Sequence, residues 1–297
     1  MLILSSKELS KGAQFLKDGE VVAFPTETVY GLGADIFNET AIRKVFTLKN
    51  RPADNPLIAH ISSFDQLPMI AREIPFEFYV LADPFFPGPL TIILKRNYNI
   101  PAIVSAGLDT IAVRMPRHSI ARELISLVGR PLVGPSANLS GKPSSTKLEH
   151  IVDDFEGRLI AAIDGGDTEL GIESTVISLY NPERPLFLRP GSITQEEIEN
   201  ILKVKLGTTS NAIISPGMKY HHYAPLTPLR LIDSLEEYAP GPKKHLIRNV
   251  SAKTLYAALR AADKGEYDEI VILLDDTIKQ NVSLMNRLLR ATNKLMN

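Results

Sequence analysis

The chain has 297 residues, of which 44% are hydrophobic and 23% are charged, and its net charge at pH 7 is −1. This is the composition of a soluble protein with a sizeable core, and it excludes a global basic field that would hold nucleic acid. The sequence contains no cysteine, which excludes disulfides, thiolate catalysis and cysteine-ligated metals and fits a cytoplasmic protein.

The N-terminal stretch lacks the basic region and the apolar segment of a signal peptide. No stretch approaches the roughly 20 apolar residues that a membrane-spanning helix needs. We therefore expect a cytoplasmic protein that makes no membrane contact.

Helices and strands are predicted to be mixed along the first 205 residues. The predicted helices are 5–19, 41–48, 64–71, 75–86, 118–128, 147–154 and 194–202. The predicted strands are 21–24, 57–61, 90–95, 110–115, 132–134, 159–163, 175–179 and 186–188. Capping boxes are expected at Ser5 and Thr194, each with a glutamate three residues later. Hairpin-like and crossover connections both occur, so we expect an α/β fold with a twisted, mixed sheet.

The pattern weakens after the last of these helices, and we expect domains at 1–205 and 229–297 joined by a linker at 206–228. The linker is rich in aromatic and basic side chains, unlike ordinary solvated linkers, and is expected to pack on another part of the protein. The small second domain has three predicted strands and two predicted helices. These elements are the strands 229–232, 245–247 and 270–274 and the helices 255–264 and 284–295.

Residues 21–60 hold many of the candidate site residues. An apolar strand, a polar turn with a flexible Gly31-Leu32-Gly33 segment, a helix and a second strand make a βαβ pattern, and ligands of such sheets bind outside the carboxyl ends of the strands. Six polar side chains are therefore expected near one another: Thr26, Thr28, Lys49, Arg51, Asn55 and His60. The alternative is a surface turn and a solvated loop beside a helix C-terminus, which favours cations.

Two pairs of side chains suggest how an anion would be bound. Lys49 and Arg51 can each contact a phosphate, Arg51 in bidentate fashion. Thr110 and Arg114 share one face of a predicted strand, with the small Ala112 between them. A buried arginine needs an anion, supplied either by a ligand or by an internal salt bridge.

Further candidates follow later strands. Ser136 and Asn138 come after a strand end and suit a phosphate and a metal-bound water or nucleobase, or else an Asx-type turn. Ser144 belongs to the run Ser144-Ser145-Thr146, which either binds a ligand or caps the next helix. Ser174 either binds a small zwitterionic ligand or is an ordinary serine at the edge of the sheet. Arg189 lies at the end of a strand, where it either binds a ligand or is solvated.

Several familiar catalytic patterns are missing. The segment 134–142 has the wrong spacing for a phosphate-binding P-loop, and the glycines at 31 and 33 lack the third glycine of a dinucleotide fingerprint. No Ser-His-Asp order and no His-x-x-x-His pattern is present. Cations and hydroxyls without a nucleophile suit electrostatic positioning of polyanionic reactants, as in nucleotidyl transfer.

Eight motifs, in order between about residue 20 and residue 225, closely resemble the YrdC-type threonylcarbamoyl-AMP synthases. They are PTETVYGLG, KNRPADNPL, FFPGPLT, AGLDTIAVRMP, GPSANLSG, GIESTV, LRPG and PGMKYHHYAP. The last motif and the small second domain resemble the long, Sua-type members. The resemblance implies a YrdC-like domain with a concave cationic pocket, a linker that crosses the site, and a small Rossmann-like α/β domain. That second domain looks shorter than usual, and 284–288 only partly match the family's final helix.

The family condenses L-threonine, bicarbonate and ATP to threonylcarbamoyl-AMP and diphosphate. A partner transferase then modifies the adenosine beside the anticodon of tRNAs that read codons beginning with A, so a weak tRNA contact is also considered. By resemblance, threonine would be held by Thr28, His60, Arg114, Gly134 and Ser174. ATP would be held by Lys49, Arg51, Asn55, Thr110, Ser136, Asn138, Ser144, Arg189, His222 and Tyr223. Lys49, Arg51 and Arg114 would be catalytic, and Mg²⁺ would enter through the ATP phosphates with no dedicated protein ligands.

Two other hypotheses stand beside the synthase. One is an RNA-binding or ribosome-associated module, against which stand the net charge of −1 and the lack of an aromatic stacking platform. The other is carbamoyl transfer from carbamoyl phosphate, as in related maturation enzymes. Those enzymes carry zinc-finger cysteines and extra domains that are missing from this sequence.

Overall fold

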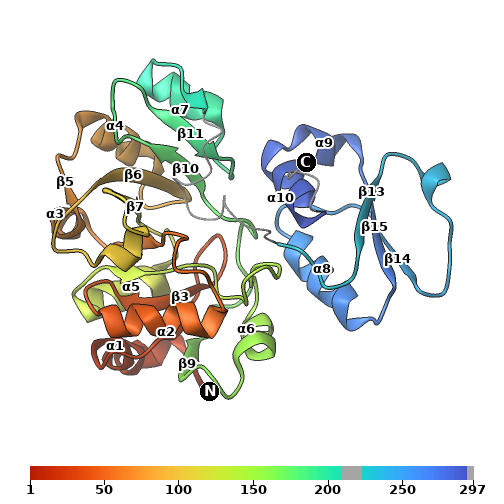
Figure 1. Cartoon of the computed structure of the whole chain (residues 1–297), viewed down its shortest axis with the longest axis horizontal. Coiled ribbons are helices and arrows are strands. Elements are labelled where there is room, and N and C mark those ends of the chain that lie inside the picture. The colour runs from red at the N-terminus through yellow and green to blue at the C-terminus, as the bar shows by residue number, and fades with distance from the viewer. Residues whose placement is uncertain (209–222, 293–297) are drawn as a thin grey trace.

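The computed structural model describes residues 1–208 and 223–292 (Figure 1). The helices are α1 (Leu9–Lys17), α2 (Glu39–Lys49), α3 (Leu67–Ile70), α4 (Phe76–Phe85), α5 (Ser119–Val128), α6 (Leu148–Phe155), α7 (Gln195–Leu202), α8 (Leu255–Lys264), α9 (Asp276–Gln280) and α10 (Val282–Ala291). The strands of the larger sheet are β1 (Leu2–Leu4), β2 (Val22–Phe24), β3 (Gly31–Asp35), β4 (Ile58–His60), β5 (Ala71–Arg72), β6 (Leu90–Arg96), β7 (Thr110–Arg114), β8 (Leu132–Val133), β9 (Ala161–Ile163), β10 (Thr175–Ser178), β11 (Leu186–Arg189) and β12 (Gly207–Thr208). Those of the smaller sheet are β13 (Leu229–Ile232), β14 (Lys244–Ile247) and β15 (Glu269–Leu273).

The larger sheet is mixed, as expected. Its strand order is β1-β9-β2-β3-β8-β4-β7-β6-β10-β11-β12, with β5 paired to β6. The pairs β4·β7 and β6·β10 are parallel, whereas β6·β7 and β10·β11 are antiparallel. This combination brings the ends of β4, β7 and β11 and the start of β10 to one edge.

The expected βαβ unit begins one strand later than predicted. Gly31-Leu32-Gly33 is not a flexible turn, because it lies in the buried strand β3, which pairs antiparallel with β2. The Phe24 ring lies over both glycines, and a Cβ at Gly31 or Gly33 would approach it to 3.0 or 3.1 Å. Strand β3, helix α2 and strand β4 then form the crossover, with β8 between the two strands.

The helices cover both faces of this sheet. Helices α1 and α5 pack on β2 and β9 through Leu16, Leu124 and other apolar side chains. Helices α2, α4, α6 and α7 contribute to a second and larger core, which includes Ile42, Phe78 and Ile198. Both predicted capping boxes, at Ser5 and Thr194, are present.

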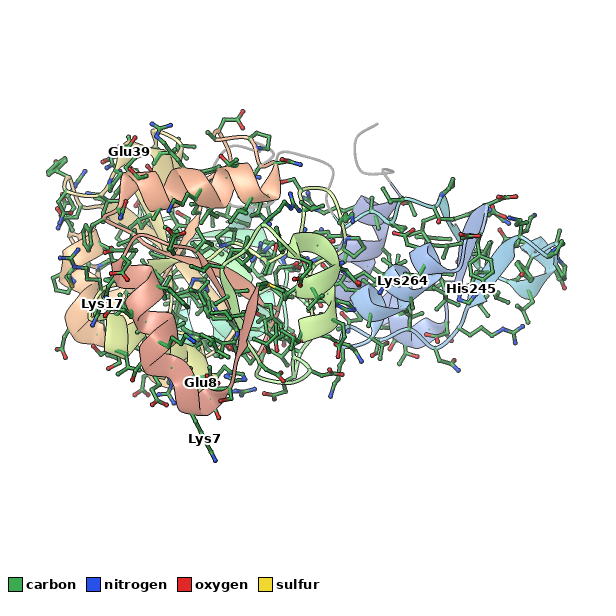
Figure 2. The ribbon with its side chains drawn as sticks, turned by 90° about the horizontal axis from the view of Figure 1, so that it is seen from below. Lys7, Glu8, Lys17, Glu39, His245 and Lys264 are labelled. Carbon is green, nitrogen blue, oxygen red and sulfur yellow. The ribbon has the colours of Figure 1, made fainter. Side chains whose placement is uncertain are left out.

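Residues 229–292, here called the C-terminal domain, have their own parallel sheet in the order β13-β15-β14. This domain forms a second lobe beside α6 (Figures 1 and 2). Its apolar core also includes Val29, Ile172 and Tyr223, which lie outside the domain in the chain. Gly171, at a φ of +75°, faces its backbone so closely that a Cβ would lie 2.5 Å from the Cα of Lys253.

Within the described ranges, no helix has the length and apolar character required to cross a membrane.

Candidate functional site

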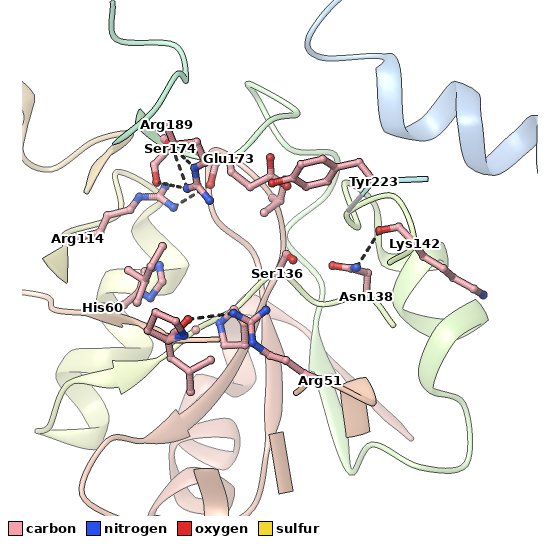
Figure 3. A pocket seen from close by; sticks show the side chains of 17 residues that line it. Arg51, His60, Arg114, Ser136, Asn138, Lys142, Glu173, Ser174, Arg189 and Tyr223 are labelled. Atoms are coloured by element: carbon pink, nitrogen blue, oxygen red, sulfur yellow. Dashed lines mark hydrogen bonds between the residues drawn. The ribbon is translucent and has the colours of Figure 1, made fainter. Parts of the chain in front are cut away.

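A pocket lies at the edge where β4, β7 and β11 end and β10 begins (Figure 3). It encloses about 70 Å³, and its empty space including the open mouth is about 620 Å³. Arg51, Arg114 and Arg189, which are far apart in the sequence, all line this one pocket.

Arg114 lies at the end of β7 and is 4% exposed. Its Nη1 donates to Thr28 Oγ1 at 2.8 Å, and its Nε donates to the carbonyl of Gly88 at 3.2 Å. Its Nη2 lies 2.7 Å from the buried Glu27 carboxylate. The internal salt bridge that the sequence left open therefore exists, and the same guanidinium also lines the pocket.

His60, at the end of β4, is a neutral group. Burial, followed by the positive charge of Arg114, lowers its pKa to about 3. Its ring meets Phe24 edge-on at 5.8 Å, and its Nδ1 is buried without a hydrogen-bond partner among the described residues. A Cβ at Gly134 would lie 2.6 Å from this Nδ1, so a glycine is needed beside the imidazole.

Ser174 and Arg189 form one network at the start of β10. Arg189 donates to the carbonyl of Ser174 from Nε at 3.1 Å and from Nη2 at 2.9 Å. The Ser174 hydroxyl lies 2.7 Å from Thr91 Oγ1 and 3.1 Å from the Arg189 Nη2. Arg189 is buried, so the alternative of a solvated arginine at this position is wrong.

The loop after β8 supplies Ser136 and Asn138 to the pocket wall. The Asn138 amide donates to the carbonyls of Leu139 at 2.7 Å and Lys142 at 3.0 Å, which holds the loop in a turn. Its Oδ1 is buried and accepts no hydrogen bond from the described residues. Asn138 therefore stabilises a turn through its amide nitrogen and also has a side-chain oxygen that can accept a hydrogen bond.

Arg51 reaches the pocket from the end of α2, but its neighbour in the motif does not. Arg51 donates to the carbonyl of Pro56 at 2.9 Å, while Lys49 is buried beneath the loop after β8. The Lys49 Nζ donates to the carbonyls of Ser136 and Asn138, at 2.6 Å in the second case. Burial, followed by the charge of Arg51, lowers the pKa of Lys49 well below its usual value.

Other sequence candidates also lie outside the pocket lining. Asn55 is buried, and its carbonyl accepts from Arg51 at 3.3 Å. Thr110 is at the opposite end of β7, about 13 Å from Arg114 at 3.3 Å per residue. A shared strand face therefore did not bring these two side chains to the same place.

Ser144 neither lines the pocket nor caps the next helix. Helix α6 has Lys147 at its N-cap and no side-chain cap. The Ser144 hydroxyl instead donates to Glu173 at 2.5 Å. Thr26, the first threonine of the first motif, donates to the carbonyl of Val29 at 2.6 Å and shapes the loop that carries Thr28.

Tyr223 lines the pocket, with its ring across from the arginine cluster (Figure 3). It is 5% exposed and stacks on Tyr256 of the C-terminal domain at 5.4 Å. His222, its predicted companion, lies outside the described residues, as does most of the predicted linker.

Two acids of the site had no role in the sequence analysis. Glu27 and Glu173 are buried, and each contacts an arginine, Arg114 or Arg287. Each acid comes directly before a predicted ligand in the chain, Thr28 or Ser174. That position was the available signal, and the burial of each carboxylate explains why it needs a charged partner.

Family comparisons match two parts of the chain. The Sua5_yciO_yrdC family, described as "Telomere recombination", matches residues 14–191. The Sua5_C family, described as "Threonylcarbamoyl-AMP synthase, C-terminal domain", matches residues 193–250.

Individual relatives match most of the chain. A threonylcarbamoyl-AMP synthase from Pyrococcus abyssi is 44% identical over 282 aligned residues, covering 90% of this chain and 80% of the relative. A threonylcarbamoyl-AMP synthase from Bacillus subtilis is 38% identical over 327 aligned residues, covering 98% of this chain and 94% of the relative. The crystal structure of P. abyssi Sua5 complexed with L-threonine has a TM-score of 0.90 and 38% identity, covering 99% of this chain and 98% of that chain.

Proposed function

The chain belongs to the Sua5_yciO_yrdC family, and on that premise we propose that it is an L-threonylcarbamoyladenylate synthase. It would condense L-threonine, bicarbonate and ATP to threonylcarbamoyl-AMP and diphosphate. The observation that carries this proposal is the convergence of Arg51, Arg114 and Arg189 on one pocket with the neutral His60. A P. abyssi relative of very similar structure has been crystallised with L-threonine, which supports threonine as the substrate.

Threonine would lie among Thr28, His60, Arg114 and Ser174, beside the backbone of Gly134. An arginine has five N–H donors, and Arg114 donates one from Nε to Gly88 and one from Nη1 to Thr28. Its Nη2 contacts Glu27 as an ion pair and makes no hydrogen bond with the described residues. The N–H groups left on the two terminal nitrogens suit a bidentate contact with the amino-acid carboxylate.

ATP would lie on the side of Arg51, Ser136, Asn138, Arg189 and Tyr223, with its phosphates toward the arginines. Lys49 would act on this subsite by holding the loop after β8 through its two carbonyl contacts. Asn55 would act in the same indirect way, because its carbonyl holds Arg51. We also propose that ATP contacts Thr110, Ser144 and His222. Only the resemblance of the motifs supports these three contacts.

Mg²⁺ would enter with ATP, bound by phosphate oxygens. In the described part of the chain, no group of three or more histidines and acids is arranged to hold a metal. The Asn138 Oδ1, a buried pocket oxygen without a hydrogen bond from these residues, is a donor atom that fits the ion. The metal would supply charge neutralisation for the phosphates.

The reaction needs no protein nucleophile. Threonine and bicarbonate give the carbamate, releasing water and a proton. A carbamate oxygen then forms a bond to the α-phosphorus of ATP, while the bond from that phosphorus to the diphosphate oxygen breaks. Carboxylate, carbamate and triphosphate repel one another, and Arg51, Arg114 and Arg189 would let them approach.

The product would pass to a transferase, which forms threonylcarbamoyladenosine in tRNA beside the anticodon. This transfer would take place in the cytoplasm, and a weak contact between this protein and tRNA belongs to the same proposal.

Incubation with ATP, Mg²⁺, threonine and ¹³C-labelled bicarbonate tests the assignment. Mass spectrometry should find threonylcarbamoyl-AMP carrying the label, and omitting threonine or bicarbonate should abolish it. Absence of this product in the complete mixture would contradict the proposal.

A further inference from the structure

The C-terminal domain contacts the pocket through one carboxylate. Glu173 lines the pocket, and its Oε2 accepts hydrogen bonds from Arg287 Nε at 2.8 Å and from the Tyr256 hydroxyl at 2.9 Å. Arg287 of α10 and Tyr256 of α8 are both fully buried. The acid therefore belongs to the site, and these two partners belong to the C-terminal domain.

This contact is an ion pair at neutral pH. Burial alone would raise the pKa of Glu173, but the guanidinium groups of Arg287 and Arg189 outweigh burial and lower it to about 2. A buried charge that loses its partner is strongly destabilising. The segment that carries Glu173 is thus held in place by the C-terminal domain.

The held segment continues directly into the threonine subsite. Arg287 Nη2 also donates to the carbonyl of Glu173 at 3.4 Å, and Arg189 donates twice to the next carbonyl, that of Ser174. Two guanidinium groups, one from each domain, therefore fix consecutive peptide units. The Ser174 hydroxyl depends on this backbone for its position.

The same cluster also fixes an aromatic side chain of the pocket. The Arg287 guanidinium lies 5.4 Å from the centre of the Tyr223 ring, which is stacked on Tyr256. Arg287 itself is not among the lining residues. Its influence on a ligand must pass through Glu173 and Tyr223.

We propose that Arg287 is a positioning residue for threonine binding, which acts from the C-terminal domain through Glu173 to fix Ser174. This inference rests on the proposed function and adds a purpose for the C-terminal domain, which is to complete the amino-acid end of the pocket. The opposing view is that Arg287 only joins the two domains. That view predicts a loss of stability with no change in threonine affinity.

The test compares the wild-type protein with Arg287→Met and Arg287→Lys, using calorimetric titration with L-threonine and the KM values for threonine and ATP. Lys264→Met is the matched control, because Lys264 Nζ pairs with Asp153 at 2.7 Å between exposed side chains of the same two domains. We expect Arg287→Met to raise the Kd and KM for threonine about 10-fold or more, the effect of losing a hydrogen bond to a charged group. Arg287→Lys should recover part of the affinity, and Lys264→Met should bind as the wild type does.

Wild-type threonine affinity in a folded Arg287→Met protein, with only its melting temperature lowered, would overturn the inference. If Arg287→Met does not fold, Tyr256→Phe and the double variant Glu173→Gln/Arg287→Met replace it, since neither leaves an unpaired charge at Glu173. Both should weaken threonine binding, and unchanged affinity in both would also overturn the inference. Failure of the wild type itself to use threonine would instead contradict the proposed function.

Discussion

Arg114, which lines the pocket, lies 2.7 Å from Glu27, and both side chains are almost completely buried. The acid balances the charge of the arginine, whose guanidinium also donates to Thr28 and to the carbonyl of Gly88. Burial alone would raise the pKa of Glu27, but the charge of Arg114 outweighs it and holds that pKa below its usual value. We therefore treat Glu27 as a residue that orients Arg114.

Glu27→Gln should weaken threonine binding and destabilise the fold. Breaking a buried ion pair costs roughly 3–5 kcal/mol, so urea unfolding should show a loss of that order, and the KM for threonine should rise. Glu169→Gln is the control, because Glu169 pairs with Arg117 at 2.7 Å between exposed side chains; its effect should stay within about 1 kcal/mol. Equal stability losses in the two variants would contradict this account.

Gly134→Ala should impair the threonine subsite by displacing His60. The added Cβ would lie 2.6 Å from the His60 Nδ1 and 3.2 Å from the Phe24 ring, so the imidazole must move. Steady-state kinetics should show a higher KM for threonine, with a smaller effect on the KM for ATP. Gly12 lies in α1, where an added Cβ would meet only side-chain carbons of other elements, at 3.2 Å or more. Gly12→Ala should therefore leave both KM values unchanged.

Lys49→Met should weaken ATP binding through the loop after β8. It removes the donor that joins the carbonyls of Ser136 and Asn138, and each such hydrogen bond contributes roughly 0.5–1.5 kcal/mol. The KM for ATP should therefore rise more than the KM for threonine. Lys44→Met, which removes a half-exposed pair with Glu20, serves as the control, and an equal change in ATP affinity in both variants would refute the role given to Lys49.

His60 should make the protein less stable in acid. Its pKa in the folded state is about 3, against 6.5 for an exposed histidine, so the unfolded chain binds the extra proton first as the pH falls below 6.5. The contribution of the neutral His60 to the free energy of unfolding is fully present above pH 6.5 and is lost between pH 6.5 and 3. The loss is about 1.4 kcal/mol per pH unit where the unfolded state binds one proton more than the folded state. His60→Asn should show a shallower decline in urea unfolding between pH 6.5 and 4.5, and an unchanged slope would contradict the buried, neutral imidazole.

The sequence predicted most elements of the fold because their periodicity and caps are local features. It missed β3, since two glycines that accommodate Phe24 look like a flexible turn, and it missed the short strand β1, which pairs with β9 far along the chain. The pocket arginines were identified from motifs. Lys49 illustrates the limit, because the direction of a buried cation depends on carbonyls almost 90 residues away. The contacts of Glu173 with Arg287 and Tyr256 were likewise invisible, since they depend on how two domains meet.

Release of diphosphate from ATP, followed with and without threonine and bicarbonate, measures most directly whether one cationic pocket brings the amino acid and the nucleotide together. The wild type should release diphosphate only when both co-substrates are present, and Arg114→Ala should lower kcat/KM for threonine by roughly 100-fold or more, as expected when a charged bidentate contact is lost. Diphosphate release that proceeds at the same rate without threonine, or that Arg114→Ala leaves intact, would contradict the shared pocket.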